Sequence, residues 1–382
     1  MIIAVDEEIP FWEEAFTPFG EVRPFTGRGL KTHDLRDVDA LIVRSITPVN
    51  ASLLDGTSVR FVGGASAGFD NIDRDFLRDR EIAFHCAAGC NADSVSEYII
   101  TALHIIASRR NWTLKEKSIA VIGVGNVGSR VVKKADALGM RVYLCDPPLR
   151  DLTGDSRYRP LDDVLQADIL TFHVPLTSGG AYPTWHMLDR KILERLSPEQ
   201  VVINSSRGPV FDSRELKTAL EARKISGAVL DVWEGEPVID YSLLEMVDIG
   251  TPHIAGTALD GKIRATEMIR EELGRFCGIR PPGFADSKYP PATRISPGQG
   301  TTGQDAVASV LLQVFDLLSK DAALRALHSI PVEQAAAGFD KLRANHPLRL
   351  EFRHFIVGLA EIHKDLANTF LALGFKIENG RG

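Results

Sequence analysis

The chain has 382 residues, of which 44% are hydrophobic and 25% charged, and its formal net charge at pH 7 is −7. That length predicts two or three domains, each with its own core, and the acidic balance argues against a general nucleic-acid binder. The acidic N-terminus and the lack of a bilayer-spanning apolar run predict neither a signal peptide nor membrane association, and hence a cytoplasmic location.

The first ninety residues alternate short apolar strands with helical segments. Strands are predicted at IIAV (2–5), ALIV (40–43), FVGG (61–64) and IAF (82–84). Such alternation is typical of an α/β unit with a parallel sheet. The four cysteines fit neither zinc-site nor redox-pair spacing, so we interpret them as reduced thiols and expect no metal.

The middle of the chain predicts a complete doubly wound sheet. A helix is expected over about 92–108, and a second helix over about 259–276 returns the chain to the first unit. The strand patterns between these helices are SIAVIG, RVYLCD, DILTFHV, VVINSS, GAVLDV and VDIGT. A nucleotide-binding domain is therefore predicted to be inserted into the N-terminal domain.

The composition changes after Gly278. Residues 279–304 are rich in Pro, Gly, Ser and Thr, which predicts a linker or an extended arm. A helix is expected over about 305–318, and a helix followed by a short strand over 359–376. This part is large enough for a small third domain. Its basic cluster is either a solvated face or reaches the site of a partner subunit; the cluster comprises Arg343, Arg349 and Arg353.

A glycine-rich motif follows the first strand of the middle segment. Gly123, Gly125 and Gly128 form G-x-G-x-x-G between a strand pattern and an amphipathic helix pattern, and the next strand ends in Asp146. Such glycines allow a tight turn and let a pyrophosphate approach the helix N-terminus. Asp146 is placed to accept hydrogen bonds from a ribose and to repel a 2′-phosphate. The motif predicts a site for NAD rather than NADP.

Polar side chains follow three further strands of this segment. Arg207 follows VVINS, Asp231 ends GAVLD with Glu236 in the next loop, and His253 follows DIGT. The carboxyl ends of the strands are where a doubly wound sheet binds ligands. A guanidinium grips a carboxylate, and a histidine held by a glutamate takes a hydroxyl proton. Together they predict oxidation of a secondary alcohol next to a carboxylate.

His173, in LTFHVPL, is the competing histidine because it too stands at a strand end. Its position directly before Val174-Pro175 suits lining the adenine–ribose side better than proton transfer. The remaining histidines lie in helices, loops or the tail, and we interpret them as structural.

The motifs GVGNVG, NSSRGPVFD, LDVWEGEP and TPHIAG, together with Asp146, resemble those of the D-isomer-specific 2-hydroxyacid dehydrogenase family over about residues 1–280. The resemblance implies an α/β fold in which a doubly wound (Rossmann) NAD domain, 93–256, is inserted into a flavodoxin-like substrate domain, 1–92 with 257–285. A small α+β C-terminal dimerisation domain, 286–382, would follow and form a homodimer.

The resemblance also implies roles for individual residues. Arg207 and Glu236 would be catalytic and His253 the proton donor and acceptor, while Ser45 and Ser66 would touch the substrate. The cofactor site would be lined by Gly123, Gly125, Asn126, Val127, Gly128, Asp146, Val174, Ser205, Asp231 and Gly256.

One substrate contact departs from the family pattern. Relatives usually carry tyrosine where this chain has Thr257, so that contact is lost or relayed by water. Arg44 lies beside Ser45, and we hypothesise that it binds a substrate phosphate; a solvated loop arginine is the alternative.

Finer sequence features narrow the expected substrate. VRSITPVN, GASAGFDNID, GCNADSVSEY, the long loop HVPLTSGGAYPTWHML and FDKLR match one branch of the family. They imply a phosphorylated four-carbon substrate, 4-phospho-D-erythronate, oxidised in pyridoxal phosphate synthesis. Another 2-hydroxy acid, such as 3-phosphoglycerate, and a non-catalytic NAD-sensing scaffold remain alternatives.

Overall fold

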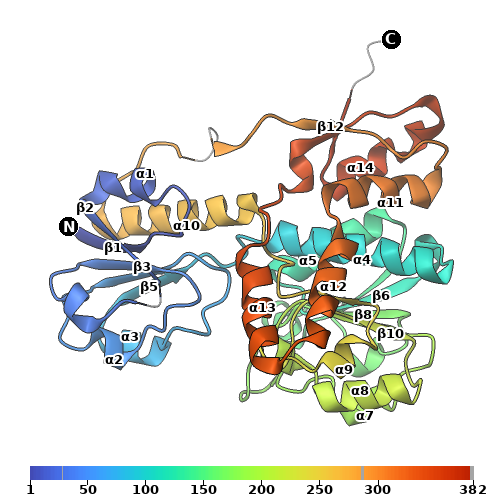
Figure 1. Ribbon diagram of the computed structural model, residues 1–382, viewed down its shortest axis with the longest axis horizontal. Helices are drawn as coiled ribbons and strands as arrows, with labels where there is room; N and C mark the ends of the chain where they lie inside the picture. Colours follow the sequence, from blue (N-terminus) through green and yellow to red (C-terminus); the bar gives the residue numbers. More distant parts are fainter. Residues whose placement is uncertain (28, 285–287, 379–382) are drawn as a thin grey trace. The chain divides into compact units, whose positions relative to one another are not determined.

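The computed structural model describes residues 1–27, 29–284 and 288–378. Two compact units are each built from two chain segments: Met1–Ala92 with Ala258–Pro291, and Asp93–Thr257 with Ala292–Gly382. Both units contain parallel sheets covered by helices (Figure 1), which confirms the predicted α/β class. None of the helices in the described ranges is long and apolar enough to cross a membrane.

The first unit contains a five-stranded parallel sheet of order β2-β1-β3-β4-β5. This is the flavodoxin-type order, as the family resemblance implied. Helices α1 and α10 cover one face of the sheet, and α2 and α3 the other (Figure 1). The elements are β1 (Ile2–Asp6), α1 (Trp12–Phe16), β2 (Glu21–Phe25), β3 (Ala40–Val43), α2 (Ala51–Leu54), β4 (Phe61–Gly64), α3 (Arg74–Asp79), β5 (Ala83–Cys86) and α10 (Leu259–Cys277).

Strand β2 was not predicted from the sequence. Its segment EVRPF contains two charged residues and Pro24, and the strand lies at the edge of the sheet. Proline is tolerated at an edge because one side of the strand needs no ladder hydrogen bonds. The strand therefore lacks the apolar run that revealed β1, β3 and β4.

The second unit is built on a six-stranded parallel sheet of order β11-β10-β9-β8-β6-β7. All six strands lie where the sequence predicted them. An isolated parallel bridge joins Leu144 of β7 to Tyr158, and it lies at the edge where a Rossmann sheet has its third strand. The elements are α4 (Ala92–Arg110), β6 (Ser118–Ile122), α5 (Asn126–Ala137), β7 (Arg141–Cys145), α6 (Pro147–Thr153), β8 (Ile169–Phe172), α7 (Arg190–Leu193), β9 (Val201–Asn204), α8 (Ser213–Glu221), β10 (Gly227–Leu230), α9 (Tyr241–Leu244) and β11 (Ile249–Gly250).

Alternate residues of β6 face two separate hydrophobic cores. Ile119 and Val121 pack with α4 and α5, whereas Ala120 and Ile122 pack with α8 and α9. Helices accordingly lie on both faces of the sheet (Figure 1). Burial on both faces explains why these strands read as continuous apolar runs.

The C-terminal part contains a small parallel sheet of order β12-β13-β14. Residues 293–295, within the segment predicted to be a linker or an extended arm, form β12, which pairs with β13. The predicted helix over 305–318 is two helices, since Asp316 accepts a hydrogen bond from the Ser319 N–H and starts a new one. The elements are β12 (Thr293–Ile295), α11 (Gly303–Val314), α12 (Leu317–Arg325), α13 (Val332–Ala344), β13 (Phe355–Val357), α14 (Ala367–Leu373) and β14 (Lys376–Ile377).

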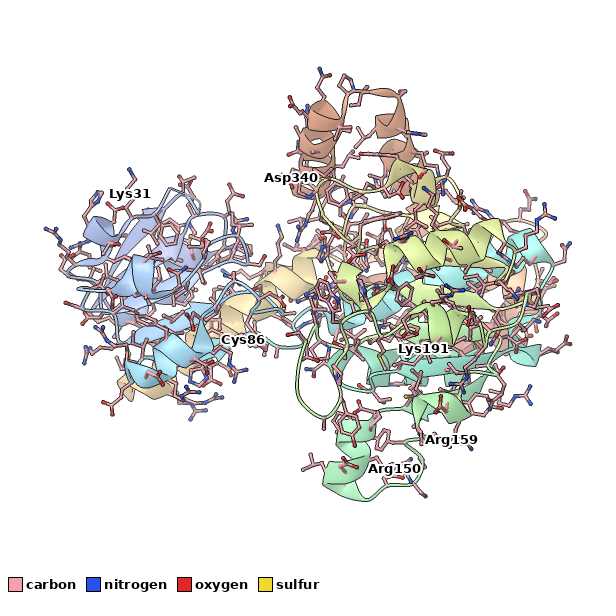
Figure 2. The ribbon with its side chains drawn as sticks, turned by 90° about the horizontal axis from the view of Figure 1, so that it is seen from below. Lys31, Cys86, Arg150, Arg159, Lys191 and Asp340 are labelled. Carbon is pink, nitrogen blue, oxygen red and sulfur yellow. The ribbon has the colours of Figure 1, made fainter. Side chains whose placement is uncertain are left out.

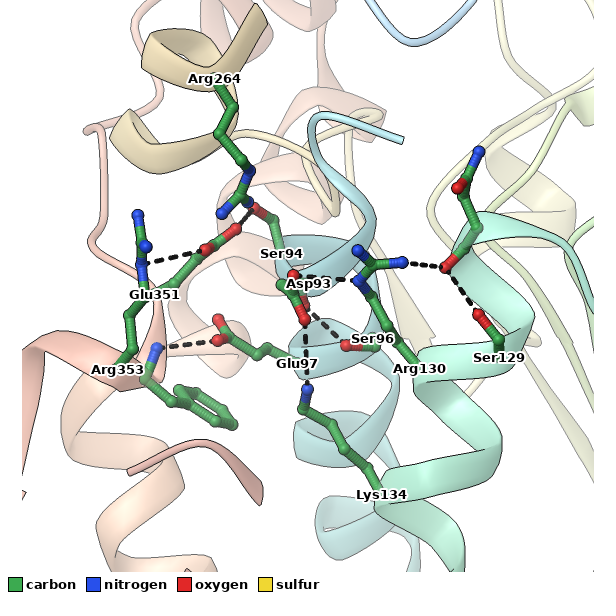
Figure 3. A network of polar contacts seen from close by, with 12 residues as sticks. Asp93, Ser94, Ser96, Glu97, Ser129, Arg130, Lys134, Arg264, Glu351 and Arg353 are labelled. Atoms are coloured by element: carbon green, nitrogen blue, oxygen red, sulfur yellow. Dashed lines mark hydrogen bonds and ion pairs between the residues drawn. The ribbon is translucent and has the colours of Figure 1, made fainter. Parts of the chain in front are cut away.

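A buried polar network attaches this part to α4 (Figure 3). Arg349, which Figure 3 does not draw, donates to the Glu97 carboxylate, which also accepts the Phe352 N–H at 2.7 Å. Ser94 donates to Glu351 at 2.7 Å. The Arg349 side chain is only 7% exposed, so its interpretation as a solvated or partner-facing residue is wrong.

Candidate active site

The glycine motif forms a cradle at the end of β6 and the start of α5. Gly123 has φ of +84°, and a Cβ there would lie 2.6 Å from the His173 carbonyl oxygen. A Cβ on Gly128 would lie 2.0 Å from the Gly123 carbonyl oxygen, whereas Gly125 faces open space. The first and third glycines therefore serve the turn and the packing, and the second leaves room for a pyrophosphate to approach the backbone.

The first residues of α5 stand beside this opening. Asn126 is exposed and Val127 half-buried, and both lie in the first turn of the helix. The free N–H groups of a helix N-terminus and its dipole favour an anion there. These residues fit a dinucleotide phosphate.

Asp146 lies directly after β7. Its Oδ2 accepts the Val124 N–H at 2.7 Å and its Oδ1 accepts the Leu149 N–H at 3.0 Å, so it fixes the glycine turn and caps α6. Each carboxylate oxygen accepts more than one hydrogen bond, so capacity remains for ribose hydroxyls. The carboxylate is therefore compatible with NAD and repels a 2′-phosphate.

A hollow lined by both signs of charge lies near α6. Arg150 and Arg159 (Figure 2) line it together with Asp162 and Asp163. The balance of two guanidinium groups and two carboxylates gives it no preference for an anion, and we assign it no ligand.

His173 lies at the end of β8, next to the half-buried Val174. Its Nε2 is 3.0 Å from Thr171 Oγ1 and its Nδ1 is 3.5 Å from Ser205 Oγ. Burial lowers the pKa of His173 to about 3, so the ring is neutral at working pH. The contact with Ser205 brings together two strand ends that were predicted to line the cofactor site.

Arg207 lies in the loop after β9, and hydrogen bonds and close backbone packing fix this loop. The buried Asn204 side chain donates to the Arg207 carbonyl at 2.9 Å, and Arg207 Nη1 donates to the Ser206 carbonyl at 2.8 Å. A Cβ on Gly208 would lie 2.0 Å from the Trp233 carbonyl oxygen. The loop that bears Arg207 is thus packed directly against the backbone that leads to Glu236.

Glu236 and His253 form a hydrogen-bonded pair. Glu236 Oε2 is 2.8 Å from His253 Nδ1, and Glu236 Oε1 accepts the Trp233 N–H at 2.7 Å. Burial opposes ionisation of Glu236, but His253, the Trp233 N–H and the charge of Arg343 together lower its pKa below the ordinary value. The pair therefore presents an ionised carboxylate to one ring nitrogen and leaves Nε2 for other chemistry.

Asp231 holds the segment that carries His253. It is 1% exposed and accepts hydrogen bonds from Thr251 Oγ1 at 2.7 Å, the Ile254 N–H at 2.8 Å and the Ala255 N–H at 2.9 Å. Burial raises the pKa of Asp231, although the charge of His253 and these donors act in the opposite direction. The backbone N–H of His253 also donates to the Asp231 carbonyl at 2.7 Å, which supports its left-handed φ of 57°.

The residues predicted for substrate lie in both units. In the first unit, Ser45 is exposed, Ser66 Oγ donates to the Gly68 carbonyl at 2.9 Å, and Arg44 Nε is 3.0 Å from the buried Asp6 carboxylate. In the second unit, Thr257 and its neighbour Gly256 are half-buried. Arg44 is therefore ion-paired rather than the solvated loop arginine of the alternative hypothesis.

Sequence reasoning missed several residues that orient this site. Asn204 ends β9, Thr251 follows β11, and the Thr251 hydroxyl also bonds the buried Tyr98 hydroxyl at 2.8 Å. Asn204 and Thr251 stand at strand ends, which is the same signal that identified Arg207 and His253. Tyr98 has no such signal, because it lies within the apolar pattern of α4.

Comparisons with known proteins found matches along most of the chain. Residues 104–255 match the family model "D-isomer specific 2-hydroxyacid dehydrogenase, NAD binding domain", and residues 288–374 match a domain of unknown function (DUF3410). The erythronate-4-phosphate dehydrogenases of Cronobacter sakazakii and Citrobacter koseri are each 42% identical over 359 residues, covering 94% of both chains.

Solved structures with the same fold are also found. A D-lactate dehydrogenase from Aquifex aeolicus, complexed with NAD and lactic acid, has a TM-score of 0.61 and 25% identity, covering 73% of this chain and 96% of its own. An NADPH-dependent glyoxylate/hydroxypyruvate reductase from Sinorhizobium meliloti has a TM-score of 0.60 at 23% identity, covering 72% of this chain and 93% of its own.

Proposed function

Because the chain belongs to the D-isomer-specific 2-hydroxyacid dehydrogenase family, we propose that it oxidises 4-phospho-D-erythronate at C2. The product is 2-oxo-3-hydroxy-4-phosphobutanoate, in the synthesis of pyridoxal 5′-phosphate. The substrate is supported by relatives that carry the name erythronate-4-phosphate dehydrogenase over 94% of this chain. The observation that carries the proposal is the 2.8 Å bond of Glu236 to His253 Nδ1, at the same sheet edge as the Arg207 loop.

The cofactor, when bound, supplies a nicotinamide ring that accepts the hydride from C2. The glycine cradle and the start of α5 would hold its pyrophosphate, and Asp146 would hold its adenosine ribose. The remaining cofactor-lining residues carried over from the family motifs are Asn126, Val127, Val174, Ser205, Asp231 and Gly256. The internal hydrogen bonds of Asp231 support an additional role in holding the His253 segment.

Arg207 binds the substrate carboxylate and orients C2. A planar guanidinium donates two parallel hydrogen bonds to a carboxylate, which fixes both position and direction. The Asn204 side chain and the close packing of Gly208 hold the loop, so that the arginine needs little reorganisation on binding.

His253 accepts the C2 hydroxyl proton at Nε2. Its Nδ1 hydrogen bonds to Glu236, so the neutral ring carries its proton on Nδ1 and exposes the Nε2 lone pair. As the hydride leaves, the ring becomes an imidazolium, and the ionised Glu236 stabilises the new charge. One hydroxyl proton and one hydride leave the alcohol, and the 2-oxo acid results.

From the family motifs and from charge, we assign substrate contacts to Ser45 and Ser66 and phosphate binding to Arg44. Thr257, which stands where relatives usually carry tyrosine, is assigned a contact relayed by water. The enzyme is further proposed to be a cytoplasmic homodimer that dimerises through its C-terminal part. Ser45 and Ser66 supply neutral hydrogen-bond donors, whereas the phosphate requires a cation, which Arg44 supplies.

Replacing His253 by alanine tests the proposed proton transfer. Turnover should be abolished while the NAD dissociation constant stays within about twofold, because the residue binds the reacting oxygen rather than the cofactor phosphates. NAD binding by fluorescence titration and NADH production by absorbance measure the two effects separately. If NAD binding is lost together with turnover, the assignment of His253 is wrong.

A further inference from the structure

The loop between β8 and α7 is held by its own hydrogen bonds, and its residues 175–189 have no role in the proposed reaction. Within it, Thr184 Oγ1 donates to the Pro175 carbonyl at 2.5 Å and accepts the Thr177 N–H at 2.8 Å. At its tip, Tyr182 Oη donates to Asp151 on α6 at 2.6 Å. These bonds close the loop on itself and tie its tip to the helix that follows Asp146.

The end of this loop runs beside the segment that follows Arg207. The His186 N–H donates to the Pro209 carbonyl at 2.8 Å, and the Leu188 N–H donates to the Val210 carbonyl at 3.0 Å. Pro209 is only two residues after Arg207. The backbone on which Arg207 stands is therefore joined to the loop by consecutive hydrogen bonds.

The His186 side chain lies between two carboxylates. Its Nε2 is 2.8 Å from Glu234 Oε1 and its Nδ1 is 3.3 Å from Asp212 Oδ2. The Trp185 ring stacks on the imidazole with centroids 4.9 Å apart. The imidazole is thus clamped on both nitrogens and on one face.

Each of the two carboxylates also accepts a hydrogen bond from the start of α8. Glu234 Oε2 accepts the Ser213 N–H at 3.3 Å, and Asp212 Oδ1 accepts the Glu215 N–H at 3.1 Å as the cap of α8. His186 therefore joins three segments: its own loop, the start of α8 and the loop that contains Glu234.

The loop 233–236 carries two Glu–His pairs. Glu236 bonds His253, and Glu234, two residues earlier, bonds His186. Both histidines have left-handed backbones, with φ of 57° and 48°. Non-glycine residues hold such a conformation only where the surroundings fix it, and such strain concentrates at functional sites.

We infer that His186 is a positioning residue that fixes Arg207 and Glu236 relative to each other. Its backbone holds the Arg207 loop and its side chain holds Glu234, while Gly208 packs against Trp233 and Glu234 between these two attachments. We call the contacts of His186 with Pro209, Glu234 and Asp212 the His186 clamp. The inference rests on the proposed function, because the clamp is assigned to the geometry of that reaction. It also gives a role to a histidine that the sequence alone predicted to be merely structural.

The test compares His186→Ala and His186→Gln with the wild type. The glutamine amide nitrogen reproduces the reach of Nε2 toward Glu234, so this variant should restore part of what alanine loses. His186→Ala should lower kcat about tenfold to hundredfold, since displacing a reacting group by about 1 Å has that effect. The NAD dissociation constant and the far-ultraviolet circular dichroism should not change. His328→Ala, at an exposed His–Glu pair on the same unit, is the matched control.

The outcomes separate this inference from the proposed function. An inactive wild type refutes the substrate assignment. A crystal structure of His186→Ala then tests the clamp alone, through lengthening of the 2.8 Å contact between Glu236 and His253. If the wild type is active and His186→Ala has the same kcat, the clamp is refuted. Loss of kcat in alanine with partial recovery in glutamine supports it, and equal loss in both with weakened NAD binding points instead to a general folding role.

Discussion

Replacing Glu97 by glutamine should flatten the pH dependence of stability. Glu97 is 3% exposed on α4 and accepts hydrogen bonds from Arg349 and the Phe352 N–H. Burial raises the pKa of Glu97 from 4.5 to about 7, even though Arg349 acts in the opposite direction. The folded protein therefore retains a proton on Glu97 at pH values where the unfolded chain has released it.

The sign and size of the effect follow from this difference. An upward shift from 4.5 to about 7 corresponds to about 3 kcal/mol, at ~1.4 kcal/mol per pKa unit. The folded state binds more protons than the unfolded state inside that window, so this stabilisation is complete below about pH 4.5 and is lost as the pH rises to about 7. From about pH 5 to about pH 8, Glu97 alone should lower the free energy of unfolding by about 2 to 3 kcal/mol.

Urea unfolding followed by circular dichroism at these two pH values measures the prediction. Any loss of packing or of the Arg349 contact in Glu97→Gln is the same at both pH values and cancels in the difference. The wild type should lose about 2 to 3 kcal/mol more stability than the variant as the pH rises. The exposed Glu116→Gln serves as control and should follow the wild type. Parallel curves for the wild type and Glu97→Gln would refute the reasoning.

Two further substitutions test the cofactor cradle and the catalytic loop. Asp146→Ser keeps a cap for α6 but removes the charge. The ratio of kcat/KM with NAD to kcat/KM with NADP should therefore fall about tenfold to hundredfold, as expected for loss of a charged hydrogen-bond partner. Steady-state kinetics with both cofactors measure this ratio, and an unchanged ratio would exclude the role of Asp146 in cofactor selection. Gly208→Ala places a Cβ 2.0 Å from the Trp233 carbonyl oxygen and should lower kcat by about a hundredfold. Gly179→Ala, where a Cβ meets open space, should keep wild-type kcat, and equal values for the two variants would contradict the packing argument.

The strands that position the site could be predicted from the sequence because each is buried on both faces. VVINSS and GAVLDV are continuous apolar runs that end in polar residues, and β9 and β10 lie there. The edge strand β2 and the strand β12 have no such runs and depend on tertiary pairing. Local patterns contain no information about a partner strand that lies far along the chain, so these two were missed.

The candidate site likewise contains residues that the sequence predicted and residues that it did not. Arg207, Glu236 and His253 were predicted because each follows a strand, and the expected contact between Glu236 and His253 is present. The clamp around His186 was missed because its partners lie 26 and 48 residues away in sequence and share no motif with it. Asp231 was predicted only as a cofactor residue, whereas its hydrogen bonds to the His253 segment became visible in the structure.

The measurement that tests the central claim most directly is NADH production with 4-phospho-D-erythronate beside D-3-phosphoglycerate. A 2-oxo acid is included in a parallel assay to recycle any reduced cofactor that stays bound. The account predicts a clear preference in kcat/KM for the four-carbon phosphate. Preference for phosphoglycerate would contradict the substrate assignment while leaving the roles of Arg207 and His253 in place, and absence of turnover with both would contradict the proposed function itself.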